Sequence, residues 1–120
     1  MVQELTEVDE RVVNLLTEAG LNRNIARVVV FLSKVGEAVS RDIERAANLR
    51  QPEVSLAMKE LKEWGWVKER ELKKKSKGRP LKSYKMVKEL KEIVSELAQK
   101  KREEIRKIEK DLEELESLVK

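Results

Sequence analysis

The chain has 120 residues, of which 42% are charged and only 3% are aromatic, so we expect one small domain with an aliphatic core and an appendage. The absence of cysteine and histidine excludes disulfides, thiol nucleophiles, the commonest zinc ligands and the usual general base at neutral pH. The net charge is +4, but residues 68–88 hold 10 basic and 2 acidic side chains, a net of +8, while the segments before and after are each net −2.

These properties favour a cytoplasmic protein that is not an enzyme and needs neither a metal nor a cofactor. The first residues lack the basic and apolar regions of a signal peptide, and no apolar run is long enough to span a membrane. Abundant glutamate and lysine without cysteine is a compositional hint of a thermophile. The confined positive charge is typical of a polyanion partner, although a solvated basic loop is the alternative.

The first half of the chain predicts two helices and a short extended link. Apolar residues at helical spacing predict a helix over 7–19, with a stripe formed by Val8, Val12, Leu15, Leu16 and Ala19. The next helix begins near Asn22 or Asn24 and ends at Gly36, and because it is apolar on most sides we expect it to be buried. The link at 37–39 can pair with a later hairpin as a third strand.

Two further helices are expected before the basic segment. Ser40 is the predicted N-cap of a helix that reaches Leu49, with Asp42 in its first turn. A tight turn at Arg50 and Gln51 precedes a helix with Pro52 at its first position, where proline is favoured. That helix ends at Gly65 and carries an apolar stripe of Val54, Ala57, Met58 and Leu61.

The second half predicts a hairpin and a long helix. Segments 66–72 and 81–86 can form strands, and the eight residues KKKSKGRP between them predict a long polar tip. A final helix is expected to begin near Val87. Its apolar spacings of 4, 3, then 3, 4, 3, 4 are typical of a coiled-coil seam, interrupted by a stutter at Lys101. We predict that this seam makes a homodimer through Leu90, Val94, Leu97, Ile105, Ile108, Leu112, Leu115 and Val119. The alternative is that the helix packs back on its own domain, through the helix at 7–19.

Two short helices joined by a tight turn and followed by a basic hairpin form the winged helix-turn-helix layout. We therefore expect a mainly α fold with a small β-hairpin (α+β), in which residues 22–87 are the DNA-binding domain. Residues 1–21 form an N-terminal helix that could support a dimer, and residues 88–120 form a coiled-coil-like dimerisation helix. A two-fold dimer would place two recognition helices on a near-palindromic operator.

The predicted DNA contacts fall on the second of the two helices and on the hairpin. The helix enters the major groove, the wing lysines contact phosphates, and Arg79 between Gly78 and Pro80 is suited to a narrow minor groove, unless it is an ordinary solvated tip residue. Tyr84 and Trp66 are expected in the core. The assigned contacts are Ser40, Arg41, Gln51, Pro52, Ser55, Leu56, Lys59, Lys62, Lys73, Lys74, Lys75, Lys77, Gly78, Arg79 and Lys82.

The segment QPEVSLAMKELKEWGWV resembles the recognition helix of ArsR- and MarR-like winged-helix regulators, and KGRPLKSYKM is similar to the wings of related, often archaeal, regulators. The resemblance covers about residues 24–87 and implies a transcription regulator that binds double-stranded DNA. This chain departs from the family at Leu56 and Ala57, where Arg or His is frequent, and Glu53 would repel phosphates unless it accepts a hydrogen bond from cytosine. Because of these departures, we expect the wing and DNA shape to contribute more to DNA recognition than direct base contacts from the helix.

A second function class shares the same fold. A winged helix can instead be a protein-binding module in a transcription or chromatin assembly, because fold does not fix function. The +8 segment favours DNA over this alternative. The operator, the direction of regulation and the existence of a small-molecule effector are not specified by the sequence, and the absence of cysteine and histidine argues against the metal sensing of some ArsR-like proteins.

Overall fold

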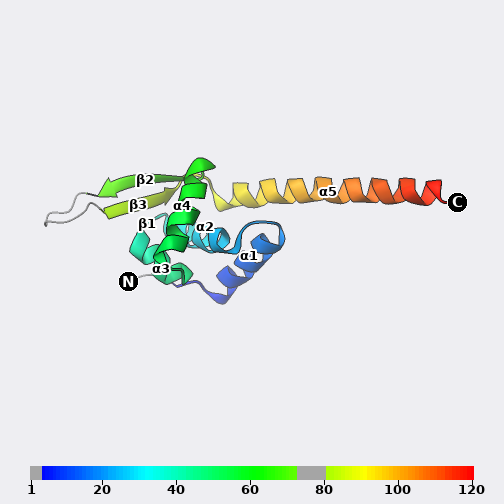
Figure 1. Cartoon of the computed structure of the whole chain (residues 1–120). Coiled ribbons are helices and arrows are strands. Elements are labelled where there is room, and N and C mark those ends of the chain that lie inside the picture. Colours follow the sequence, from blue (N-terminus) through cyan, green and yellow to red (C-terminus); the bar gives the residue numbers. More distant parts are fainter. Residues whose placement is uncertain (1–3, 73–80) are drawn as a thin grey trace. The chain divides into compact units, whose positions relative to one another are not determined.

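The computed structural model describes residues 4–72 and 81–120. Along the chain these form α1 (Glu7–Glu18), α2 (Arg23–Val35), β1 (Glu37–Val39), α3 (Ser40–Ala47), α4 (Gln51–Glu63), β2 (Val67–Leu72), β3 (Leu81–Met86) and α5 (Leu90–Leu118) (Figure 1). The chain divides into two compact units, Met1–Leu90 and Lys91–Lys120. Within the described ranges, no helix combines the length and the apolar character that crossing a membrane requires.

The buried helix of the first unit is α2, as predicted. The side-chain oxygen of Asn22 caps it by accepting hydrogen bonds from the backbone N–H groups of Asn24 and Ile25, at 2.9 and 3.2 Å. Gly36 ends it with a φ of +88°, a conformation that glycine adopts without a steric penalty. Its buried side chains are Ile25, Ala26, Val28, Val29, Val30, Phe31 and Leu32.

Helix α1 forms where it was predicted, but the stripe assigned to it is partly wrong. The buried side chains are Val13 and Leu16, whereas Val8 and Leu15 are 72% and 47% exposed. The apolar residues of α1 lie on two adjacent faces, and Glu10 and Asp9 form ion pairs with Arg27 and Lys34 of α2. Periodicity alone does not distinguish two overlapping faces of one helix.

The turn between α3 and α4 is formed by residues other than those predicted. Asn48 adopts a left-handed conformation with a φ of +54°, and its backbone N–H bonds to the carbonyl of Arg45. Gln51, expected in the turn, is the first residue of α4, so Pro52 lies one position later, still within the first turn. Ser40, expected to be an N-cap, is the first residue of α3 and forms no cap hydrogen bond.

The three strands form an antiparallel sheet in the order β1-β3-β2, which confirms the third strand and the hairpin. The carbonyl of Trp66 accepts hydrogen bonds from the N–H groups of Val87 and Lys88, at 2.9 and 3.3 Å. These bonds close the base of the hairpin. Because the N–H groups of Val87 and Lys88 pair with Trp66, α5 begins at Leu90 rather than near Val87.

One guanidinium joins three helices of the first unit. Arg27 on α2 donates two hydrogen bonds to the carboxylate of Glu10 on α1, at 2.7 and 2.8 Å, and one to the carbonyl of Ala47 at the end of α3, at 2.7 Å. The Arg27 side chain is only 18% exposed. Removing it would leave the carbonyl and the carboxylate without these donors.

We predict that Arg27→Ala lowers the free energy of unfolding by about 2 kcal/mol, since hydrogen bonds to charged groups in a partly buried site are lost. Arg23→Ala is the matched control on the same helix, because Arg23 makes one exposed hydrogen bond, to Asn14. Urea unfolding followed by circular dichroism measures both values. Equal effects of the two substitutions would contradict a special role for Arg27.

Candidate nucleic-acid interface

Helix α4 separates a buried stripe from an exposed polar face, as the sequence predicted. Its buried side chains are Val54, Ala57, Met58 and Leu61, each at most 2% exposed. The opposite face is solvent-exposed over every position assigned to DNA contact, namely Gln51, Pro52, Ser55, Leu56, Lys59 and Lys62. The apolar stripe thus fixes the rotation of α4, so that a polar face is held outward on a rigid helix.

Two of the exposed side chains form a preorganised pair. The Gln51 side-chain amide donates a hydrogen bond to the hydroxyl of Ser55 across one helical turn, at 2.7 Å. The bond leaves the carbonyl oxygen and one N–H of the Gln51 amide available, a donor and an acceptor together. A glutamine amide with both groups free matches the edge that adenine presents in the major groove.

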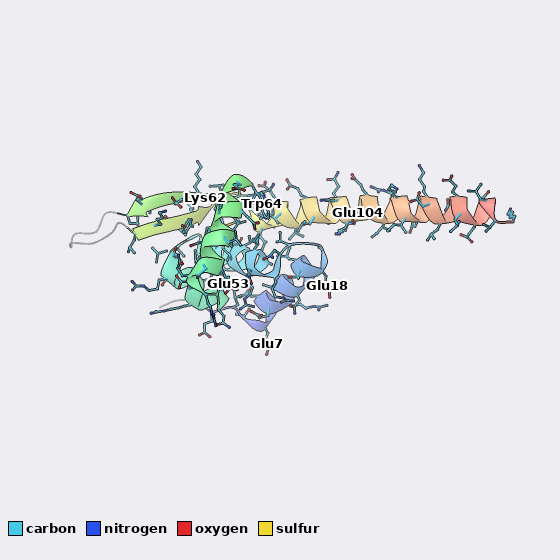
Figure 2. All side chains as sticks on the ribbon, viewed as in Figure 1. Glu7, Glu18, Glu53, Lys62, Trp64 and Glu104 are labelled. Atoms are coloured by element: carbon cyan, nitrogen blue, oxygen red, sulfur yellow. The ribbon has the colours of Figure 1, made fainter. Side chains whose placement is uncertain are left out.

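The carboxylate of Glu53 is used within the fold. It accepts a hydrogen bond from the backbone N–H of Arg50 at 2.9 Å and a longer one from the Asn24 side chain at 3.4 Å. Figure 2 shows Glu53 at one end of α4 and Lys62 with Trp64 at the other. The Glu53 carboxylate thus pairs with the N-cap backbone of α4, a structural role that was not expected from the sequence.

A second carboxylate, Glu69 on β2, forms ion pairs with one lysine of α4 and one lysine of β3. It accepts a hydrogen bond from the ammonium of Lys62 at 2.8 Å, and Lys82 Nζ lies 3.9 Å from its other oxygen. The Lys62 hydrogen bond, aided by the positive charge of that lysine, holds the pKa of Glu69 below its ordinary value of 4.5. Two of the predicted DNA-contacting lysines therefore share an internal counterion.

Tyr84 on β3 lies beneath the same cluster. It is 6% exposed, which confirms its prediction as a core residue. Burial of the phenol, followed by the negative charge of Glu69, raises the pKa of Tyr84 above 10.0. An interaction with the Ser40 side chain opposes this rise and lowers the pKa of Tyr84.

On the other face of the sheet, a carboxylate joins all three strands. Glu37 on β1 accepts two hydrogen bonds from the guanidinium of Arg70 on β2, and the hydroxyl of buried Ser83 on β3 donates a third at 2.8 Å. The Arg70 hydrogen bonds, then the one from Ser83, lower the pKa of Glu37. This network ties the short strand β1 to the far edge of the hairpin.

The two tryptophans that flank Gly65 lie at the base of the hairpin. Their ring centroids are 5.0 Å apart in an edge-to-face arrangement, and the ammonium of Lys88 lies 5.6 Å from the Trp66 centroid. Trp64 is 45% exposed, and Trp66 is half-buried rather than fully in the core as predicted.

The structure brings the predicted α4 and β3 residues to the sites just described, and Arg41 is exposed on α3. The predicted wing-tip residues Lys73, Lys74, Lys75, Lys77, Gly78 and Arg79 lie outside the described residues. Sequence reasoning missed Glu69 and Glu37. The alternation of charge along β2, in which Glu69 lies between Lys68 and Arg70, was the available signal that one carboxylate faces the helices.

No protein-family model and no curated protein sequence matches this chain. Similar solved structures include TrmBL2, an archaeal chromatin protein whose structure shows a novel mode of DNA binding, with a TM-score of 0.55 and 24% identity. The match covers 92% of this chain but 42% of TrmBL2, so the chain spans less than half of that protein.

Two further solved structures are similar to this chain. NadR, solved in complex with 4-hydroxyphenylacetate, has a TM-score of 0.54 and 20% identity over 92% of this chain and 76% of its own. NMB1585, a MarR family regulator from Neisseria meningitidis, has a TM-score of 0.52 and 17% identity over 92% of this chain and 84% of its own. These likenesses confirm the winged helix-turn-helix fold, and membership of the MarR-like family stays a prediction. The ArsR-like and archaeal assignments stay predictions.

We predict that protonation of Glu69 destabilises the fold in acid. Because its pKa is lowered in the folded state, its contribution is present above pH 4.5 and is lost as the pH falls through the lowered value. The Glu69→Gln variant should therefore lose less stability than the wild type between about pH 6 and about pH 3. Urea midpoints measured across this range check the difference, and parallel curves for the two proteins would contradict it.

Proposed function

We propose that the chain is a transcription regulator that binds double-stranded DNA as a homodimer, with α4 in the major groove and the β2–β3 hairpin on the phosphate backbone or in the minor groove. The observation that carries this proposal is the division of α4 into a fully buried apolar stripe and an outward polar face. The width of the major groove admits an α-helix presented in this way.

The charge distribution supports a nucleic-acid partner. The segment 68–88 has a net charge of +8, and its described cations include Lys68, Arg70, Lys82 and Lys85. On the paired strands Lys68 lies directly opposite Lys85, a like-charge pair that destabilises a sheet. Glu37 on β1 is the other cross-strand partner of Lys85 and offsets part of this positive charge. We assign the wing-tip lysines and Arg79 to the nucleic-acid partner on the strength of the sequence.

Dimerisation is supported by α5 considered by itself. This helix has 29 residues and a length of about 44 Å by its rise per residue. Its apolar side chains Ile105, Ile108, Leu112 and Leu115 are 53–57% exposed, so a stripe runs along it without cover. Pairing with a second copy would bury this stripe and bring two recognition helices to one duplex.

The rival function is a protein-binding winged helix. It is favoured by the exposed Leu56, which is 61% exposed in the middle of the polar face of α4. A leucine can contact a thymine methyl group or anchor a protein partner. The strongly basic hairpin distinguishes the two, because a protein partner requires no such density of positive charge.

The salt dependence of binding tests the proposal. With about five phosphate contacts per subunit, log K against log salt should have a slope of roughly −4 to −5 per subunit, since each contact releases counterions. Fluorescence anisotropy with a duplex selected from random DNA measures it at several salt concentrations. A slope near zero, or no binding at low salt, would contradict DNA binding and favour the protein-binding rival.

A second test separates the roles of the helix and the wing. Ser55→Ala or Gln51→Ala should weaken binding to the selected site by about tenfold and binding to random DNA much less. Because the two side chains are hydrogen-bonded, the double variant should lose less than the product of the single losses. Lys82→Ala should weaken binding to both DNAs alike, as a phosphate contact does.

Lys107→Ala is the control for these variants, since Lys107 lies on α5 and pairs with Asp111 in its own helix at 3.3 Å. It should leave both affinities unchanged. If Ser55→Ala and Gln51→Ala act equally on selected and random DNA, then α4 does not read sequence.

A further inference from the structure

The apolar stripe of α5 is best defined in its C-terminal half. The spacing 3, 4, 3 assigns Ile105 and Leu112 to the a positions of a heptad, and Ile108 and Leu115 to the d positions. All four are more than half exposed, whereas Leu90 and Leu97 nearer the start of the helix are half-buried. The half that needs a partner is therefore residues 101–119.

The residues that flank this stripe are mostly acidic. The e positions hold Arg102, Glu109 and Glu116, and the g positions hold Glu104, Asp111 and Leu118. Within the helix Lys101 lies 3.1 Å from Glu104, and Lys107 lies 3.3 Å from Asp111. These pairs offset the charges of Glu104 and Asp111, so the e positions carry the least compensated charge beside the stripe.

A parallel, in-register pair of α5 helices would bring acidic residues together. Each g position then faces the e position of the next heptad on the other helix. Glu104 would face Glu109 of the second copy, and Asp111 would face Glu116. Counting both copies, this gives four acid–acid contacts, while Arg102 would face Leu97 and have no acidic partner across the seam.

An antiparallel pair places different residues opposite each other. With residue 110 of both copies at the two-fold axis, Ile105 packs against Leu115 of the second copy, and Ile108 packs against Leu112. Positions e then face e, so that Arg102 meets Glu116 of the second copy twice per dimer. Glu109 and Asp111 each face the same residue of the second copy. The antiparallel pair therefore has two attractive and two acid–acid contacts, whereas the parallel pair has four acid–acid contacts.

The competing antiparallel register, shifted by one heptad toward the C-terminus, is less favourable. It would pack Leu112 against Leu115 and Ile108 against Val119 of the second copy. It would also place Glu109 opposite Glu116 twice, with no attractive contact in exchange.

We propose that two copies of α5 pair antiparallel over residues 101–119, with residue 110 at the two-fold axis and Arg102 opposite Glu116 of the second copy. The proposal rests on the homodimer of the proposed function and specifies its geometry. Leu90, Val94 and Leu97 lie outside this overlap.

Charge variants distinguish the two orientations by the sign of their effect. In the antiparallel pair, Glu116→Arg replaces each Arg102–Glu116 attraction by a repulsion, so dimerisation should weaken by about fivefold at low salt. In the parallel pair the same substitution would relieve the contact with Asp111 and strengthen the dimer. Glu113→Arg, in the same turn but on the outer b position, controls for the effect of charge on the helix itself.

The reciprocal exchange completes this test. Arg102→Glu combined with Glu116→Arg restores the attraction in the antiparallel pair, so the double variant should regain the wild-type dissociation constant. Sedimentation equilibrium measures all four proteins under the same conditions. Strengthening of the dimer by Glu116→Arg alone, or failure of the exchange to restore it, would overturn the proposal.

Distances between spin labels give an independent measurement on the full chain, which contains no native cysteine. Labels are attached to Lys110→Cys and, separately, to Lys100→Cys. In the antiparallel pair, equivalent residues separate along the axis by about 3 Å for each residue from 110, which gives about 30 Å at residue 100 and none at residue 110. In a parallel pair neither position has an axial offset.

Pulsed electron paramagnetic resonance should therefore report a much longer distance for position 100 than for position 110. Similar distances at both positions, or a wild-type protein that is monomeric at tens of micromolar, would overturn the antiparallel pair. The salt titration with DNA is scored separately. A parallel dimer that binds DNA contradicts only the orientation, and an antiparallel dimer without DNA binding contradicts only the function.

Discussion

Burial of α2 is the constraint on which the rest of the first unit depends. Its apolar residues occupy nearly every side of the helix, so the other elements must cover it, and their rotation is set by what they bury. At the edge of this core, the Arg27 guanidinium on α2 donates hydrogen bonds to α1 and to the end of α3. Because the apolar stripe of α4 packs against this core, the polar face of α4 points outward on a rigid support.

Three carboxylates of the proposed interface form hydrogen bonds or ion pairs within the fold. Glu53 satisfies the start of α4, Glu69 holds the cations of α4 and β3, and Glu37 joins the three strands. These residues explain why a face intended for a polyanion contains acidic side chains. Each is positioned by hydrogen bonds that make the local fold, and Glu69 in addition limits how freely Lys62 and Lys82 can reach a phosphate.

The sequence alone predicted the elements that depend on strong local signals. The apolar stripe of α4, the buried α2, the hairpin and the long final helix all follow from periodicity and from stop residues such as Gly36. It failed where the outcome depends on contacts between distant segments. The inward face of α1 depends on packing against α2, Ser40 is the first residue of α3 rather than its N-cap, and the role of Glu69 requires a lysine from another element. None of these partners lies within one helical turn in the sequence.

The central claim is that the outward face of α4 and the hairpin bind duplex DNA, and mapping amide chemical shifts by NMR during titration with a selected duplex tests it most directly. The account predicts that the largest shifts occur in Gln51–Lys62 and in the β2–β3 hairpin, with small shifts in α1 and in residues 101–119. Large shifts confined to α5, or to the tryptophans at the base of the hairpin, would contradict the account.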